Sequence, residues 1–424
     1  MAGSSTGFTC ENERTARVTA TDVVWVGIDA GKASHHAAAV DAGGKRLWSV
    51  KVANGQRQIE ELIGRAAKSA AGGEVRWAVD LVSPAAALLL AILLASGQKV
   101  VYVPGRVVHG MAGVFRGEGK TDAKDARIIA DTARMRGDLA ELTATDELVV
   151  ELTRLTSYRA DVMADWVRGV NRLRDLLTSI FPALEASFDY STRSALILLT
   201  GYCTPDEIRQ AGPGAVAAYL REHGAWAKGI DAMADTTVRA AQQQTVALPG
   251  EATTAMLVKK LARQLLDLDR EVKDTDKLLT RRFRDHPQAR IIESLPGMGP
   301  ILGAQFLVAT DGRALEAFTS PGRLASYAGL VPVPKDSGRV TGNYHRPRRY
   351  HRPLRNVFYM MALSSLRAEG PSKAFYQRKR GENKIHTQAL LALARRLVDV
   401  LWALLRDNRT YSPIPPAQVI ATAA

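Results

Sequence analysis

Two aspartates, Asp122 and Asp125, stand three residues apart in the segment 117–136, GEGKTDAKDARIIADTARMR. On a helix they lie on one face, and Thr121 offers an oxygen that caps the helix start. Neighbouring carboxylates repel each other unless a cation lies between them, so the pair is a candidate for a divalent-metal site. Taken alone, such a pair in a basic helix is more often a solvated face, neutralised here by Lys120, Lys124 and Arg127.

Two further carboxylates stand at the ends of predicted strands. Residues 23–29 (VVWVGID) and 75–79 are runs typical of buried strands, and they lead to Asp29 and Asp80. Taken alone, a strand-end aspartate is more often a turn or cap residue. Ligands of open α/β sheets, however, gather outside strand ends, and sets of carboxylates hold two divalent ions in nucleases and polymerases. The four acids together therefore predict one metal site.

The elements that must position these acids occupy residues 21–146, after a loose tail at 1–20. Strands are expected at 37–40 and 47–52 around the turn 41–44, and a fifth strand at 99–103. Helices are expected at 56–70 and across the apolar run 85–95. A three-stranded meander followed by alternating helix and strand predicts a mixed α/β sheet with helices on its faces.

A helical region is predicted over residues 147–286. Apolar residues recur at three- and four-residue steps over 148–180 and again over 254–283, which favours an antiparallel coiled coil, within the chain or between protomers. The intervening residues 189–250 are expected to be a helical insertion with Gly-Pro breaks. This insertion has no function that its sequence indicates.

The third region, 287–424, is predicted to be mainly α-helical and begins with a helix, a tight turn and a second helix. Gly297 and Gly299 stand in the turn, where glycine lets a backbone approach a phosphate. This pattern favours a helix-hairpin-helix that grips nucleic acid without regard to sequence. A plain glycine turn between packed helices is an equally good interpretation. A final amphipathic helix is expected at 387–405.

A basic segment follows, interleaved with aromatic residues and suited to phosphate binding and base stacking. Its cations are Lys335, Arg339, Arg346, Arg348, Arg349, Arg352 and Arg355. Within it, Ser337 stands in the turn sequence KDSGR, where its hydroxyl could attack a phosphodiester while arginines stabilise the developing charge. A solvated basic loop with an ordinary turn serine is the alternative.

The composition favours a nucleic-acid partner. The chain has 424 residues, 46% of them hydrophobic, and 57 Lys and Arg against 43 Asp and Glu give a net charge of +14. A merely soluble basic protein is the alternative on charge alone. Two cysteines are too few for a disulfide framework. The N-terminus lacks an apolar signal core and the longest apolar run is too short to span a bilayer, so we expect a cytoplasmic protein without membrane contact.

In both its N-terminal and its C-terminal parts the chain resembles the DEDD insertion-sequence transposases of the IS-one-ten group, which are related to the Piv invertases. VGIDAGKASHHAAAVD, WAVD and GKTDAKDARIIA are similar to the RuvC-like segments of that family in order and spacing. ESLPGMGPILGAQFLVA, ASYAGLVPVPKDSGRVTG and RRYHRPLRNVFYMMA are similar to its C-terminal transposase domain. The resemblance covers nearly the whole chain.

The resemblance implies a RuvC/RNase H-like domain at 21–146 and a serine transposase domain at 287–424. It implies a Mg²⁺-dependent recombinase that excises and inserts a mobile element, acting on DNA element ends and target and guided by a structured bridge RNA. Asp29, Asp80, Asp122 and Asp125 would be its acidic tetrad and Ser337 its nucleophile. The family has Glu where this chain has Asp80, which bears on metal geometry. Because two DNA ends must be held, we expect an even-numbered homo-oligomer, a dimer or tetramer.

Three functions therefore compete. A recombinase needs both the tetrad and Ser337, whereas a RuvC-like structure-specific nuclease needs the tetrad alone. A nucleic-acid-binding protein without catalysis needs only the basic segment and the glycine turn.

Overall fold

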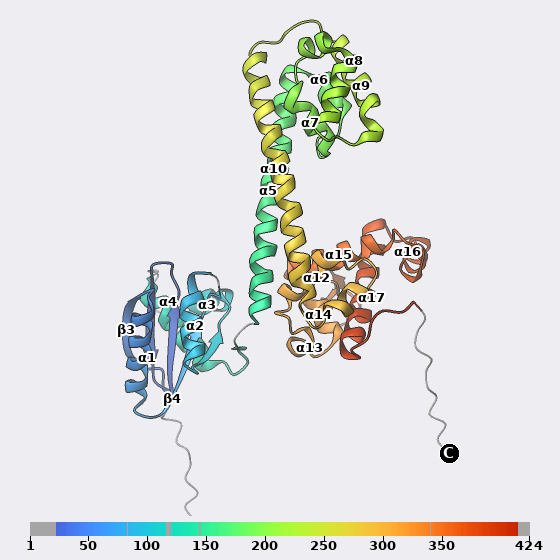
Figure 1. Ribbon diagram of the computed structural model, residues 1–424. Coiled ribbons are helices and arrows are strands. Elements are labelled where there is room, and N and C mark those ends of the chain that lie inside the picture. Colours follow the sequence, from blue (N-terminus) through green and yellow to red (C-terminus); the bar gives the residue numbers. More distant parts are fainter. Residues whose placement is uncertain are drawn as a thin grey trace, which may run out of the picture. The chain divides into compact units, whose positions relative to one another are not determined.

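The computed structural model describes residues 23–82, 84–115, 119, 121–143, 146–339 and 341–413. The chain divides into two compact units, residues 1–144 and 145–424, and each is described by itself (Figure 1). The predicted tail at 1–20 lies outside the described residues, as does Lys120.

A six-stranded mixed sheet forms the centre of the first unit, in the order β3-β2-β1-β4-β5-β6. β1, β2 and β3 are an antiparallel meander, β4 and β5 run parallel to β1, and β6 pairs antiparallel with β5. The strands are β1 (Val23–Asp29), β2 (Ser34–Val40), β3 (Arg46–Ala53), β4 (Glu74–Val79), β5 (Lys99–Tyr102) and β6 (Glu141–Leu142). The meander and the parallel strands confirm the prediction, although β2 begins three residues earlier than expected.

Helices cover both faces of this sheet. α1 (Gln56–Ala70) and α2 (Ala87–Ala95), which follows a 3₁₀ turn, pack on the face that carries Val24, Val26 and Ile28. α3 (Gly105–Ala112) and α4 (Asp122–Met135) cover the opposite face. Each strand of the sheet centre therefore buries both of its faces, which explains why the strands are continuous apolar runs.

Two long helices, α5 (Glu147–Ile180) and α10 (Glu251–Arg284), lie side by side in the second unit (Figure 1). They run antiparallel, because Glu151 pairs with Arg282 at 2.9 Å while a side chain at Gly169 would meet Leu265. Each has 34 residues and is therefore about 50 Å long. The predicted pairing occurs within the chain, while knobs-into-holes packing stays a prediction.

The insertion between the two long helices is helical, as predicted, and has a hydrophobic core of its own at their far end (Figure 1). Its helices are α6 (Pro182–Ser187), α7 (Arg193–Gly201), α8 (Pro205–Glu222) and α9 (Ile230–Gln242). We call residues 181–250 the head. The predicted Gly-Pro breaks correspond to a kink at Gly212 inside α8 and to Gly250 at the start of α10, both with positive φ.

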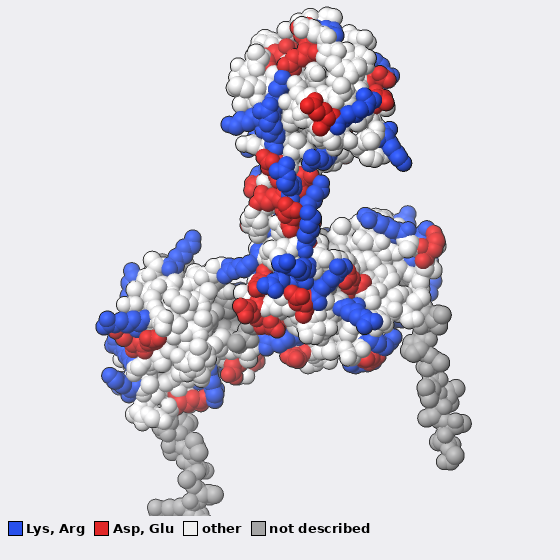
Figure 2. All heavy atoms as spheres, viewed as in Figure 1, with Lys and Arg blue, Asp and Glu red and all other residues white. Residues whose placement is uncertain are grey.

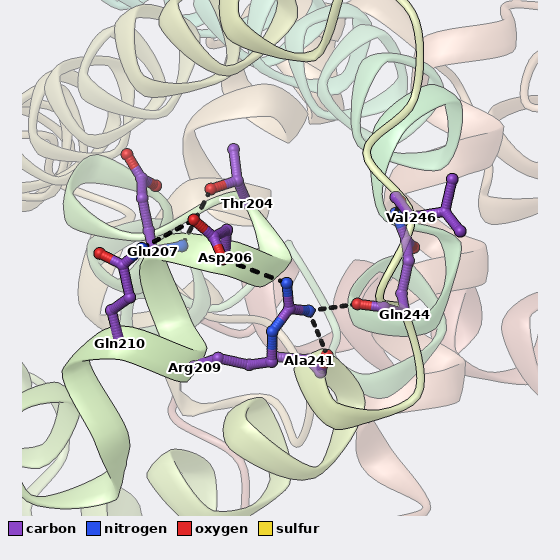
Figure 3. A network of polar contacts seen from close by, with 8 residues as sticks. All are labelled: Thr204, Asp206, Glu207, Arg209, Gln210, Ala241, Gln244 and Val246. Atoms are coloured by element: carbon purple, nitrogen blue, oxygen red, sulfur yellow. Dashed lines mark hydrogen bonds and ion pairs between the residues drawn. The ribbon is translucent and has the colours of Figure 1, made fainter.

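Arg209 links α8 to the C-terminal end of α9 and to the residues that follow it (Figure 3). From α8 its guanidinium donates to the carbonyl of Ala241 at 2.9 Å, to that of Gln244 and to the Asp206 carboxylate. The Gln244 side chain in turn donates to the carbonyl of Ile180, the last residue of α5, at 2.8 Å. Carbonyls at helix C-termini have no partner within their own helix. The Gln244 side chain supplies a donor to the last carbonyl of α5, and Arg209 adds a second donor to the Ala241 carbonyl of α9, which also accepts from the Gln244 amide at 3.4 Å.

The C-terminal part of the second unit, from residue 285 onward, is mainly helical around one large core. Its helices are α11 (Ala289–Ser294), α12 (Pro300–Ala309), α13 (Ala314–Ala317), α14 (Pro321–Tyr327), α15 (Arg352–Ser365), α16 (Pro371–Gly381) and α17 (His386–Arg406). α17 confirms the predicted final helix and buries Leu390, Val398 and Leu401 in this core. Two short strands, β7 (Val333–Pro334) and β8 (Tyr344–His345), form a hairpin that was not predicted. Among the described residues, no helix combines the length and the apolar character that crossing a membrane requires.

Removing the Arg209 side chain is expected to destabilise the head. Arg209→Ala removes a side-chain donor from the partly buried carbonyls of Ala241 and Gln244 and should lower head stability by about 2 kcal/mol. Hydrogen exchange across residues 181–250 measures this. Arg221→Ala removes only a solvent-exposed ion pair with Asp231 and is the control. Equal exchange in the two variants would contradict the assigned role of Arg209.

Candidate functional site

The two strand-end carboxylates are neighbours at one edge of the sheet. β1 and β4 pair in parallel register up to Ile28 opposite Val79, so the next residues, Asp29 and Asp80, follow side by side. Adjacent strands lie about 4.8 Å apart. Asp29 still belongs to the ladder and pairs with His36 of β2, whereas Asp80 is the first residue beyond β4.

α4 brings its first turn toward the same edge. The Thr121 hydroxyl accepts a hydrogen bond from the Lys124 amide at 3.2 Å, as the sequence predicts, and Asp122 and Asp125 stand in the first turn. At the other end of α4, Arg134 donates to the carbonyl of Ala42 at 3.3 Å, in the turn between β2 and β3. That turn lies at the start of β1, so α4 runs antiparallel to β1 and begins near Asp29.

Gly27 sets how closely α4 approaches β1. A Cβ atom on Gly27 would lie 2.2 Å from the carbonyl oxygen of Ala126 and 2.3 Å from the nitrogen of Ala130. The backbone of α4 therefore rests directly on the strand, one residue beyond Asp125 and two residues before Asp29. Residues two apart in a strand point to the same face of the sheet, so the Asp29 side chain lies on the same side as Gly27, which is the side that α4 covers.

The carboxylates fit a divalent cation in their donor chemistry. Mg²⁺ takes oxygen ligands and is commonly held by one or two carboxylates together with substrate phosphates. Within the described ranges, no three side chains of the His, Cys, Asp or Glu types lie close enough together to hold a metal ion. The structure therefore brings the four predicted residues to one edge without drawing three of them into a cluster.

His36 and Gly27 lie beside the candidate aspartates and were not predicted from the sequence. His36 lies opposite Asp29 in the antiparallel pair, and its Nε2 is 2.8 Å from the Ser49 hydroxyl on β3. The register of β1 with β2 could have identified His36, because the short connection at 30–33 fixes which residues of these two strands face each other. No signal in a single sequence distinguishes Gly27 from other strand glycines.

Ser337 belongs to the second unit and is exposed in the loop between β7 and β8. The loop is closed by the Lys335 amide, which donates to the Asn343 carbonyl at 2.8 Å, and by the Asn343 amide, which donates to the Asp336 carboxylate at 3.0 Å. Gly338 follows Ser337 with a φ of 54°. The serine hydroxyl is thus presented to solvent by a structured turn.

The predicted basic side chains of this segment are exposed on the β7–β8 hairpin and at the start of α15, and they are Lys335, Arg339, Arg346, Arg348, Arg349 and Arg352. Tyr350 lies among them, packed against Gly329, with the Arg355 guanidinium 4.7 Å from its ring centre. Partial burial raises the pKa of Tyr350, but Arg355 and Arg346 outweigh it, so that the pKa lies below its ordinary value. The arginines that lower this pKa also make the local potential more positive, which favours phosphate binding.

The two turn glycines have different surroundings. The helix, turn and helix are present as α11, residues 295–299 and α12. A Cβ atom on Gly297 would lie 2.2 Å from the Met361 carbonyl oxygen of α15, so this glycine is required by packing. A Cβ atom on Gly299 would meet nothing within 4 Å. Phosphate binding by this turn stays a prediction, and Gly299 is the residue at which a backbone has room to approach.

Positive charge is concentrated in the C-terminal part. Residues 285–424 hold 20 Lys and Arg against 9 Asp and Glu, whereas the head holds 5 against 7. Further cations stand in the last turn of α10, at Arg281, Arg282 and Arg284. Figure 2 shows Lys and Arg gathered where the long helices enter the C-terminal part. The electrostatic attraction for a polyanion is thus strongest from α10 onward and weakest at the head.

Comparison with known proteins decides the family. Residues 26–182 match a transposase family model of the DEDD type, and residues 289–377 match the model described as "Transposase IS116/IS110/IS902 family". The 44.8 kDa protein of insertion element IS116 from Streptomyces clavuligerus is 53% identical over 396 residues, which cover 93% of this chain and 98% of that protein. The chain belongs to this transposase family.

Two other relatives show how far the similarity of this transposase extends. The 42 kDa protein of insertion element IS900 from Mycobacterium paratuberculosis is 51% identical, over 92% of the transposase and 97% of the relative. The pilin gene-inverting protein of Moraxella bovis is 29% identical over 130 residues, which are 29% of the transposase and 38% of the relative. Both the predicted family and its link to the invertases are confirmed.

Substituting Gly27 tests whether the contact of α4 with β1 positions the site. In Gly27→Ala the new methyl meets backbone atoms of α4, so α4 must shift or detach, at a cost of about 3 kcal/mol. A shift of about 1 Å in catalytic groups can lower activity by about 100-fold. We expect DNA cleavage to fall by that factor.

Gly64→Ala in α1 is the matched control, because its methyl meets nothing within 4 Å. Circular dichroism should report a folded protein for both variants. If Gly27→Ala cleaves DNA at the rate of the control, the contact of α4 with β1 does not position the site.

Proposed function

We propose that this transposase is a DNA recombinase that cuts and rejoins strands with a metal-dependent acidic tetrad and a serine nucleophile. The proposal is supported by the backbone positions of four aspartates toward one edge of the sheet, at two adjacent strand ends and in the first turn of α4. In a chain of this family, that arrangement matches the chemistry of phosphodiester cleavage.

Asp29, Asp80, Asp122 and Asp125 hold Mg²⁺ in this proposal. The ion, when bound, polarises the scissile phosphate and neutralises its charge. The protein residues orient that chemistry: the β1–β4 pair fixes Asp29 and Asp80 at neighbouring positions, and the Gly27 contact holds α4. Neighbouring carboxylates repel both one another and a phosphate backbone, which favours cation binding before DNA binding.

Ser337 forms the covalent link. Its oxygen attacks the phosphorus, a serine–phosphate ester forms, and the bond from phosphorus to the leaving deoxyribose oxygen breaks; the leaving oxygen takes up a proton. The ester conserves the bond energy for rejoining, which hydrolysis would lose. The guanidinium groups of Arg339 and Arg346 offset the negative charge on the phosphate. Exposure of Ser337 on a closed loop supports access to DNA.

The carboxylates of α4 are tested by replacing one of them. Asp125→Asn keeps size and removes charge, so DNA cleavage with Mg²⁺ should be lost while binding to labelled DNA changes less than about twofold, because the basic segment is untouched. The same holds for Asp122→Asn. Asp138→Asn, an exposed acid of the same unit paired with Arg136, is the control. Full cleavage by either α4 variant would remove α4 from the active site.

The serine step separates a recombinase from a RuvC-like nuclease. Ser337→Ala removes one oxygen and no charge, so folding and DNA binding should stay unchanged. Denaturing gels with end-labelled DNA should show a protein–DNA adduct for the wild type and none for this variant. Thr341→Ala, another exposed hydroxyl of the same loop, should form the adduct normally. Strand exchange by Ser337→Ala would favour the nuclease and make Ser337 a turn residue.

A structured bridge RNA and a homo-oligomer complete the proposal. The net charge of +14 and the extent of the basic C-terminal part exceed what one short DNA site requires, which supports a second nucleic acid. Sequencing RNA that copurifies with the transposase should find one transcript enriched from DNA flanking its gene. Random cellular RNA would contradict the guide, and light scattering that gives a monomer on paired DNA ends would contradict the oligomer.

A further inference from the structure

Asn54 joins the two loops that leave the carboxylate edge. Its side-chain nitrogen donates to the Lys32 carbonyl at 3.0 Å and to the Ala85 carbonyl at 3.4 Å. Its backbone amide donates to the Ala33 carbonyl at 3.0 Å. Lys32 and Ala33 lie in the loop after Asp29, and Ala85 lies in the segment after Asp80.

The chemistry of these contacts requires an amide side chain of this length. An asparagine Nδ2 carries two hydrogens, and each is directed to a carbonyl of a different loop. Aspartate has the same shape but offers only acceptors, which would face two carbonyl oxygens. Alanine leaves both carbonyls without this donor. The contact therefore depends on the hydrogen-bond donors of the amide and not only on side-chain packing.

Asp29 and Asp80 depend on these loops to different degrees. Asp29 is inside the sheet, paired with His36 on one side, and its backbone is fixed by the ladder. The pairing of β4 with β1 ends at Val79, so Asp80 is the first residue whose path the loop decides. Asn54 contacts the 3₁₀ turn Pro84–Ala86 at Ala85, five residues beyond Asp80.

Asn54 and the carboxylates lie on opposite sides of the sheet edge. Strand alternation puts Asn54 on the same face as Val50 and Val52, which pack with α1 and α2. Asp29 is on the α4 face, with Gly27. Asn54 therefore acts on the carboxylates through the backbone.

We infer that Asn54 is the positioning residue of the metal site and sets the place of Asp80 beside Asp29. This inference rests on the proposed metal-dependent function. The short side chain of Asp80 makes the placement demanding, because aspartate reaches one methylene less far than glutamate. By fixing the backbone near Asp80, Asn54 compensates for the shorter reach of the aspartate side chain.

The test measures Mn²⁺ binding to the full chain by calorimetry and electron paramagnetic resonance, without DNA. Asn54→Ala and the isosteric Asn54→Asp should weaken Mn²⁺ binding by up to about 10-fold, the low end of the effect of losing a direct hydrogen-bond partner of a metal ligand, because Asn54 acts through the backbone. Gln98→Ala is the control, because Gln98 bonds Trp77 and Ser96 at the opposite edge of the same sheet. It should bind Mn²⁺ as the wild type does.

A second substitution distinguishes positioning from general loosening. Asp80→Glu alone should keep or raise activity at limiting Mg²⁺, because it only adds reach. In the Asn54→Ala background it should restore most of the lost Mn²⁺ affinity. No recovery would overturn the inference, because Asp80 would then not be the group that Asn54 positions.

Hydrogen exchange gives a readout that needs no metal. In Asn54→Ala, residues 30–33 and 84–86 should exchange faster together, while the strands keep their protection. Loosening of only one loop, or Mn²⁺ affinity equal to that of Gln98→Ala, would overturn the inference and leave the proposed function standing. If Asp125→Asn binds Mn²⁺ as tightly as the wild type does, both this inference and the proposed function would be overturned.

Discussion

The contact of α4 with β1 depends on the missing side chain at Gly27. A Cβ atom there would stand inside the van der Waals radii of two backbone atoms of α4, so the helix and the strand touch main chain to main chain. Small residues continue this contact, since Ala126 and Ala130 face the strand. Because interiors pack like crystals, such a contact tolerates little sliding. The height and register of α4, and hence of its two aspartates, follow from one glycine.

The electrostatics of the two units are complementary in a way that suits the proposed reaction. The first unit carries four aspartates toward one edge of its sheet, while residues 285–424 carry most of the excess positive charge. In the proposed reaction, affinity for nucleic acid and chemistry on it would therefore reside in different units. A cation bound by the aspartates would reverse the sign of the local potential and so would allow a phosphate to approach them.

Much of the first unit could be predicted from its sequence, because buried strands and amphipathic helices leave periodic patterns. Four of the five expected strands overlap closely with those observed, and the helix at 56–70 agrees at both ends. β2 extends further than predicted, since His35 and His36 mask its start. Asp29 and Asp80 followed from strand ends, and Asp122 and Asp125 from helical spacing. Gly27, His36 and Asn54 did not follow, because their roles arise from register and from contacts between segments distant in the chain. The β7–β8 hairpin was not predicted, because each of its strands has only two residues and is too short to show an alternating pattern.

The paired long helices impose a rule on how this chain can vary in length. Leu152, Leu279 and Phe283 are embedded in the C-terminal core, while Leu173, Leu177 and Leu265 are embedded in the core of the head. One end of the helix pair thus packs in the C-terminal core and the other end packs in the core of the head. The chain enters and leaves the head at this second end. Removing two turns from α5 alone would misalign every contact at one end, whereas removing seven residues from each helix keeps both in register. Insertions and deletions compatible with folding should therefore come in matched pairs along α5 and α10, or excise the head as a whole.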